Sequence, residues 1–392
     1  MLALRLARGA HPLVQLRRLL VAAASAGTGF LFLCTLGYAL GHPESSGDAL
    51  LRLAWCLVPL AATVYLAVAV ARSDPGTRPR AGLSAVGLGP GRLTLLASVS
   101  TAVACTLGSS LALLFFLHLR GDLTGLPFDG AGRGLLAADR PLPLAATLTL
   151  LSFVPLAAST ASALVLRPRI LKAGRPDATT DEPQELKEPS PAPGGLPWGV
   201  ALLAAGLAVE TYAAHARSGS GFPMPGGLGG SPSGVLAGWA LTAVGLAMAG
   251  PGLTYLCGRA LQAVRPGAVR LLAGRVLMEE SGRIGRPLGV LCAVASGVYA
   301  ATVLYGGGRP ALGPMSALGG LLVVGCALAT LATAAVEARQ VRRHTQTALL
   351  RLGAPATLLR GSAALRAGAL LAVFGPLTWA VAELSATPLL SR

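Results

Sequence analysis

The sequence predicts an all-α, polytopic integral membrane protein, and three observations lead to this fold class. Hydrophobic residues make up 53% of the 392-residue chain and charged residues only 12%. The charged residues are concentrated between long uncharged stretches, and the basic ones lie mainly in every second intervening segment. A helix rises about 1.5 Å per residue, so about 20 apolar residues cross a hydrocarbon core of about 30 Å. A helix also satisfies its own backbone hydrogen bonds, which lipid cannot do for it.

Nine apolar stretches meet or approach this length, and each of them is a candidate transmembrane helix. The fifth stretch is the shortest and reaches full length only by including Glu210. The uncharged cores of the nine stretches are residues 19–40, 53–71, 93–119, 142–166, 196–209, 235–257, 287–305, 310–336 and 367–382. We therefore predict about nine membrane spans.

The basic residues predict the orientation of these spans. Short loops rich in Lys and Arg stay on the cytoplasmic side of a membrane. Of the 32 Lys and Arg residues, 25 lie in alternate segments and the other 7 in the remaining ones. The segments rich in basic residues are 1–18, 72–92, 167–197, 258–286 and 337–366. The N-terminus is thus predicted to be cytoplasmic, and nine spans would place Arg392 outside. Since only Lys172 and Lys187 accompany 30 Arg, we expect a bacterial cell (inner) membrane from a GC-rich genome.

The composition argues against several other classes of protein. The net charge of +16 follows from the topology rather than from one basic soluble face, so no nucleic-acid partner is expected. The basic cytoplasmic loops favour contact with the anionic lipid bilayer. All six cysteines lie within or at the ends of apolar stretches, which predicts no disulfide framework. No Cys/His cluster and no nucleophile–base set occurs, so we expect no metal, no cofactor and no catalytic residue.

An internal repeat predicts how the spans are organised. The matched positions are Arg5 with Arg275, Gly27 with Gly297, Leu83 with Leu349, and Gly87 with Gly353. Both copies would begin on the cytoplasmic side, which indicates parallel rather than inverted repeats. The four predicted parts are an N-terminal four-helix membrane repeat (1–166), a disordered cytoplasmic linker rich in Pro and acidic residues (167–197), a linking transmembrane pair (198–257) and a C-terminal membrane repeat of three helices (258–392).

The second matched loop, residues 337–366, has a polar beginning and then a short apolar run. Gly353 and Pro355 follow that run, and these residue types end helices. The pattern predicts a short helix lying across the membrane surface, a break, and a second helix rising into the last span. Two interpretations stay open. The short helix docks in a groove of a soluble partner, or its apolar residues pack on the bilayer interface.

The residues from Arg343 to Ala354, ending in Ala-Leu-Leu-Arg-Leu-Gly-Ala, resemble the cytoplasmic loop of FtsX-like permeases of ABC transporters. The order of spans resembles the two-repeat members of the peptide-antibiotic-export type. In that family the loop supplies a coupling helix that docks on a separate cytoplasmic ATPase. The resemblance therefore implies an ATPase-coupling role for Leu349, Leu350, Arg351, Gly353 and Ala354 in the second copy, and for Leu83, Gly87 and Leu88 in the first.

The chain departs from the family pattern in three ways. Gln346 and Thr347 stand where the family usually has an acidic residue. The outer loops 41–52 and 306–309 are too short for the large extracellular domain that is common in the family. The second repeat has one predicted span fewer than the first.

We expect a transmembrane permease subunit of an ABC-type exporter, which couples a P-loop ATPase, in two copies, to movement of an amphiphilic peptide or lipid. The chain has no G-x-x-x-x-G-K-[ST] motif, so ATP hydrolysis is expected in the partner. The alternatives are a secondary transporter or pore without an ATPase, and a membrane scaffold or sensor subunit. Glu210 is a candidate substrate contact, because an ionisable group in a span usually has a function. The alternative for Glu210 is a carboxylate at the membrane interface.

Overall fold

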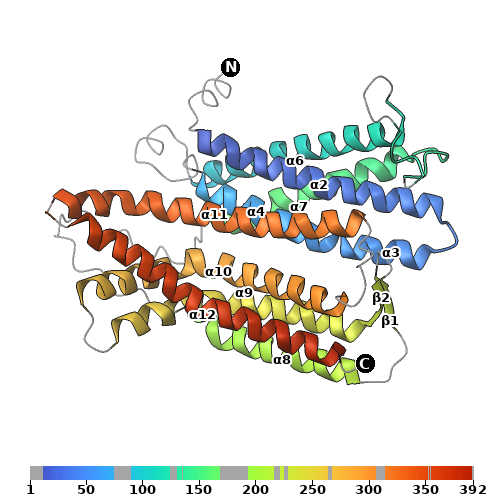
Figure 1. Ribbon diagram of the computed structural model, residues 1–392. Helices are drawn as coiled ribbons and strands as arrows, with labels where there is room; N and C mark the ends of the chain where they lie inside the picture. Colours follow the sequence, from blue (N-terminus) through green and yellow to red (C-terminus); the bar gives the residue numbers. More distant parts are fainter. Residues whose placement is uncertain are drawn as a thin grey trace, which may run out of the picture. The chain divides into compact units, whose positions relative to one another are not determined.

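The computed structural model describes residues 12–74, 90–123, 130–134, 136–167, 193–215, 221–224, 228–263, 267–305, 314–351, 353 and 355–390. This part of the chain is mainly helical, with one two-stranded ribbon (Figure 1). The helices are α2 (Pro12–Gly41), α3 (Ser46–Trp55), α4 (Leu57–Ser73), α6 (Pro90–Arg120), α7 (Leu144–Leu166), α8 (Leu196–His215), α9 (Ser233–Gln262), α10 (Ala268–Tyr305), α11 (Pro314–Arg351) and α12 (Ala356–Leu390). The strands are β1 (Gly221–Met224) and β2 (Leu228–Pro232).

Among the described residues, seven helices are long and apolar enough to cross a membrane. The seven spans are α2, α3 together with α4, α6, α7, α9, α11 and α12. A shorter apolar helix covers Leu196–Tyr212 in α8, and α10 contains the apolar stretch predicted over 287–305. The prediction of an all-α, multi-pass membrane protein is confirmed, whereas the count of nine spans stays a prediction.

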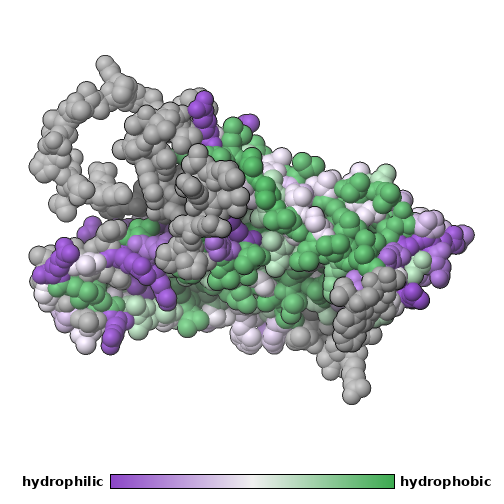
Figure 2. All heavy atoms as spheres, turned by 90° about the horizontal axis from the view of Figure 1, so that it is seen from above, coloured by the Kyte–Doolittle hydropathy of each residue, from purple (hydrophilic) through white to green (hydrophobic). Residues whose placement is uncertain are grey.

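The distribution of polar and apolar side chains is the reverse of that in a water-soluble bundle. Thr28 and Thr63 are fully buried, and their hydroxyl oxygens lie 2.9 Å apart. Leu107, Leu144 and Leu321, by contrast, have between 64% and 76% of their surface exposed. On the face drawn in Figure 2, hydrophobic side chains cover most of the helix surfaces and hydrophilic ones gather near helix ends. Outward leucines and inward hydroxyl groups are what lipid around a helical bundle favours.

The described helices belong to two compact units. Unit 1 contains α2, α3, α4, α6 and α7, together with the first part of α11 up to Thr333. Unit 2 contains α8, α9, α10 and α12, together with α11 from Ala334 onward. The helices α8 and α9, which correspond to the predicted linking pair, therefore pack with α10 and α12. The predicted linker 167–197 lies outside the described residues except at its two ends.

Unit 1 is organised around α2, which packs against α4, α6 and α7. At Gly108 the backbone of α6 comes so close to α2 that an added Cβ would collide with the carbonyl oxygen of Ala22. The Ser25 hydroxyl donates to the Cys105 carbonyl oxygen at 2.8 Å in the same region. A small residue at the crossing and a hydroxyl that bridges two helices together replace the hydrophobic driving force that is absent in lipid.

The helices of unit 2 approach one another through glycines. On α8 and α9, an added Cβ at Gly245 would lie 2.5 Å from the Leu203 nitrogen. On α9 and α10, an added Cβ at Gly285 would meet backbone atoms of Gly250 and Pro251. Backbone atoms cannot move aside as a flexible side chain can, so these glycines set the distance between the helices.

Replacing Gly285 with Ala is expected to destabilise unit 2, because the new methyl group has no space against Pro251. Overpacking of this kind costs about 1–3 kcal/mol. Gly282 lies one turn away on α10 and has no atom within 4 Å of an added Cβ. G282A should therefore leave the protein unchanged or slightly more stable, since Ala favours helix by up to about 1 kcal/mol over Gly. Thermal unfolding of the purified protein in detergent measures both variants, and equal midpoints would contradict the packing argument.

Candidate functional site

The second predicted coupling loop forms the tip where α11 turns into α12, and we call the part of α11 from Ala334 onward, together with α12, the hairpin. The uncharged stretch of α11 ends at Val336, but the helix continues to Arg351, which is about 22 Å further along its axis. Gly353 then adopts φ +85, and its N–H donates to the Leu350 carbonyl oxygen at 3.1 Å. This left-handed conformation, which favours glycine, ends α11 and lets α12 begin at Ala356.

The prediction of a separate helix lying across the membrane surface is wrong. Residues 346–351 continue α11 without a break, because no helix-ending residue precedes Gly353. Leu350 is 49% exposed at the tip, and Arg351 is also exposed. Leu349 lies in the same turn of α11, its side chain being outside the described set, and Ala354 lies outside the described residues. The tip thus presents at least one leucine and one arginine away from the apolar part of the hairpin.

A largely buried ion pair connects α10 and α11 in unit 2 near this hairpin, and Arg366 on α12 acts on it electrostatically. Arg342 Nε on α11 lies 3.1 Å from Glu280 Oε1 on α10, with side chains 21% and 9% exposed. Arg366 on α12 acts electrostatically on Glu280, as does Arg283. Burial raises the pKa of Glu280 above its ordinary value, although these three arginines oppose the change. We call Glu280, Arg342 and Arg366 the brace.

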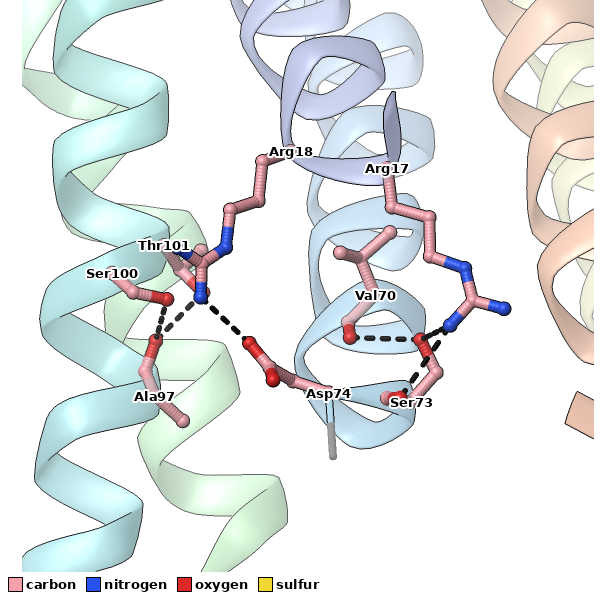
Figure 3. A network of polar contacts seen from close by, with 8 residues as sticks. All are labelled: Arg17, Arg18, Val70, Ser73, Asp74, Ala97, Ser100 and Thr101. Atoms are coloured by element: carbon pink, nitrogen blue, oxygen red, sulfur yellow. Dashed lines mark hydrogen bonds and ion pairs between the residues drawn. The ribbon is translucent and has the colours of Figure 1, made fainter. Parts of the chain in front are cut away.

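The first predicted coupling loop cannot be compared directly, since Leu83, Gly87 and Leu88 lie outside the described residues. The helix ends beside that loop are described, and Figure 3 shows the polar contacts there. Arg18 on α2 pairs with Asp74 after the end of α4, with Nη2 and Oδ2 2.9 Å apart. Arg17 donates to the hydroxyl oxygen of Ser73 at 2.9 Å. The start of α2 is thus tied to the end of α4.

Glu210, the candidate substrate contact, is buried between three helices of unit 2. The residue is 1% exposed, and the Thr242 hydroxyl on α9 donates to its Oε1 atom at 3.1 Å. The hydroxyl of Ser385 on α12 hydrogen-bonds the same side chain. Gly238 on α9 makes room for it, because an added Cβ there would lie 2.5 Å from the Glu210 Cγ atom. This burial argues against the alternative interpretation of Glu210 as an exposed carboxylate at the membrane interface.

An apolar groove of about 630 Å³ opens on unit 1 between α2, α6 and the start of α11. Its walls include Phe30 on α2, Phe115 and Leu119 on α6, and Met315 and Leu318 on α11. The sequence analysis missed this groove, as it missed the brace and the partners of Glu210. Each of these features joins residues far apart in the chain, and no local pattern indicates such a pairing.

Among the described residues, no group of three His, Cys, Asp or Glu side chains is placed to hold a metal ion. Comparison with known proteins gives no match, since no family model fits the chain and no curated protein or solved structure is significantly similar to it. The resemblance to FtsX-like permeases therefore rests on the loop residues and the order of spans alone.

Proposed function

We propose that this protein is the transmembrane permease subunit of an ABC-type exporter and that the tip of the α11–α12 hairpin docks on a cytoplasmic P-loop ATPase. The observation that carries the proposal is the exposed Leu350 at a helix end that extends about 22 Å past the uncharged stretch of α11. Burying the exposed part of a leucine in a groove contributes about 1 kcal/mol. Arg351 beside it adds a charge that an acidic rim on the partner would complement.

The brace supports this role because it would transmit movement of the tip. Glu280, Arg342 and Arg366 come from α10, α11 and α12, so displacement of the hairpin changes contacts on all three helices. A buried ion pair tolerates little separation, since each charge would be left without its partner in an apolar setting. A push on the tip is therefore passed to the membrane helices rather than absorbed by a flexible loop.

The groove on unit 1 favours the proposal that the substrate is amphiphilic. Its described walls are aromatic and aliphatic, and its volume of about 630 Å³ is within the usual range for small-molecule sites. An apolar groove of this size accommodates an acyl chain or the hydrophobic residues of a peptide. This favours a lipid or an amphiphilic peptide over a sugar or an ion as the molecule that is moved.

Two polar pairs are consistent with parallel repeats and hence with two ATPase sites. Arg18 and Asp74 connect the first helix of the predicted N-terminal repeat to the second. Glu280 and Arg342 connect the first two helices of the predicted C-terminal repeat, with the two charges exchanged. Both pairs would lie at the cytoplasmic side in the predicted topology. Each repeat then braces the helices beside its own loop, as two independent docking sites require.

Native mass spectrometry of the full-length chain tests the proposal after co-expression with a candidate P-loop ATPase, which is sought among the neighbouring genes. We expect one permease chain with two ATPase copies in the solubilised complex. Recovery of the permease alone, under conditions where the ATPase is folded and soluble, would contradict the coupling role. A complex with one ATPase, or with two permease chains for two ATPases, would contradict only the two-site arrangement.

The proposed orientation has the N-terminus in the cytoplasm of a bacterial cell, as the 25-to-7 division of basic residues predicts. On a cysteine-free background, Leu228→Cys should react with a membrane-impermeant thiol reagent in intact cells. Thr180→Cys should react only after the cells are opened. Labelling of position 180 but not 228 in intact cells would reverse the orientation and remove the hairpin tip from the cytoplasm.

A further inference from the structure

The two oxygens of the Glu210 carboxyl group have different hydrogen-bond surroundings. Thr242 donates to Oε1 at 3.1 Å, whereas no donor among the described residues reaches the buried Oε2 atom. An ionised carboxylate accepts hydrogen bonds on both oxygens, while a neutral carboxyl has one accepting oxygen and one O–H donor. A buried carboxylate oxygen without a donor costs more than a buried neutral O–H without an acceptor, so this arrangement favours the neutral carboxyl with its proton on Oε2.

The electrostatic surroundings of Glu210 point the same way. In the described part of the chain, no Lys or Arg forms an ion pair with it. On α12, Glu383 is the acidic residue nearest in sequence to Ser385. Its carboxylate accepts a hydrogen bond from the Tyr299 hydroxyl of α10 at 2.9 Å. On α9 the side chain facing Glu210 is the uncharged Thr242. On α8 itself Tyr212 is exposed and points away. An isolated charge buried in such a setting is costly unless it binds a cation.

We propose that Glu210, with Thr242 and Ser385, forms a proton-binding site in unit 2. The proton passes between Oε2 and water, and no other covalent bond changes. Thr242 supports the carboxyl from α9 and Ser385 from α12, so loading and unloading alter how α12 packs against α8 and α9. This site is separate from the proposed ATPase contact at the hairpin tip, and it would link the packing of the membrane helices to proton uptake.

Labelling with dicyclohexylcarbodiimide tests the proposal, because this apolar reagent reacts with neutral carboxyl groups within membranes. The purified full-length chain is treated at pH 6 and pH 9, and adducts are located by peptide mass spectrometry. We expect labelling of Glu210 to be at least about tenfold greater at pH 6, with no adduct in E210Q. Glu383 is the internal control, since it lies on α12 only two residues from Ser385 and should be labelled far less. Thr242→Val should move the midpoint of labelling to higher pH, because it removes a donor that favours the ionised form.

Three results would overturn the proposal. One is labelling of Glu210 that matches Glu383 or does not change with pH. Another is the absence of both the adduct and the infrared carbonyl band of a protonated carboxyl in the difference between wild type and E210Q. A third arm adds sodium chloride, with N-methylglucamine chloride as the control. Protection by sodium alone would assign the site to sodium ions and overturn the proton assignment. All arms use the permease chain by itself, so they do not depend on whether an ATPase binds.

Discussion

Replacing Leu350 with Asp is expected to abolish recovery of the ATPase with the purified permease. The substitution places a carboxylate where the proposed partner groove is apolar, and burying that charge costs about 3 kcal/mol or more. Such a loss weakens binding by more than about a hundredfold. ATPase activity that depends on the permease should fall to the level of the isolated ATPase. Pull-down from detergent solution and a steady-state ATPase assay measure the two effects.

Two variants separate the loss of Leu350 from the gain of a negative charge. Thr347 lies one turn earlier on α11 and is exposed, so T347D adds the same charge while keeping Leu350. It should reduce binding only slightly. L350A should give an intermediate loss, near the value of about 1 kcal/mol for the buried part of the side chain. Full ATPase recovery with L350D would show that the tip packs on the bilayer interface instead.

Replacing Arg342 with Met is expected to produce the largest loss of stability. It leaves the Glu280 carboxylate buried without its closest partner, which was 3.1 Å away. Removing one member of a buried pair costs about 3 kcal/mol or more, and the lower end applies because Arg342 is 21% exposed. R339M is the matched control, since Arg339 is exposed on the same helix. Thermal unfolding in detergent should show a large fall in midpoint for R342M and almost none for R339M.

The pH dependence of this loss identifies its cause. The pKa of Glu280 is already raised by burial, and the loss of Arg342 should raise it further. A carboxyl group whose pKa is higher in the folded protein than in the unfolded chain is neutral in both states at low pH, so it does not oppose folding there. It destabilises the folded protein increasingly as the pH rises from the pKa of the unfolded chain to that of the folded protein. The cost of R342M should therefore be greatest at neutral and alkaline pH and shrink as the pH falls toward 4.5, the ordinary value for Glu. The double variant E280Q/R342M should recover much of the stability at pH 7, and equal losses in both variants would contradict the charge argument.

The membrane class could be predicted from the sequence because hydrophobicity and helix length are local properties. Most of the apolar stretches are long enough by themselves to require a helix, and each of the nine predicted cores contains a helix in the described part of the chain, though seven spans qualify by length and composition. The hairpin tip was predicted only in part. Gly353 and Pro355 correctly indicated the end of a helix, but the sequence did not show that the residues before them continue α11. A polar run such as 337–347 is compatible with either a loop or a helix, since the choice depends on whether α11 is already helical on its N-terminal side.

The sequence by itself determined that this is an all-α membrane protein, because the cost of leaving backbone groups unpaired in lipid admits few alternatives for such stretches. The tertiary structure decided which polar residues meet. Glu210 with Thr242 and Glu280 with Arg342 are brought together only by helix packing. That packing depends on the glycines of unit 2, such as Gly238 and Gly285, whose missing side chains let backbones approach. A glycine in an apolar stretch does not reveal which helix it faces, so the pairing of buried charges follows from three-dimensional contact and not from spacing along the chain.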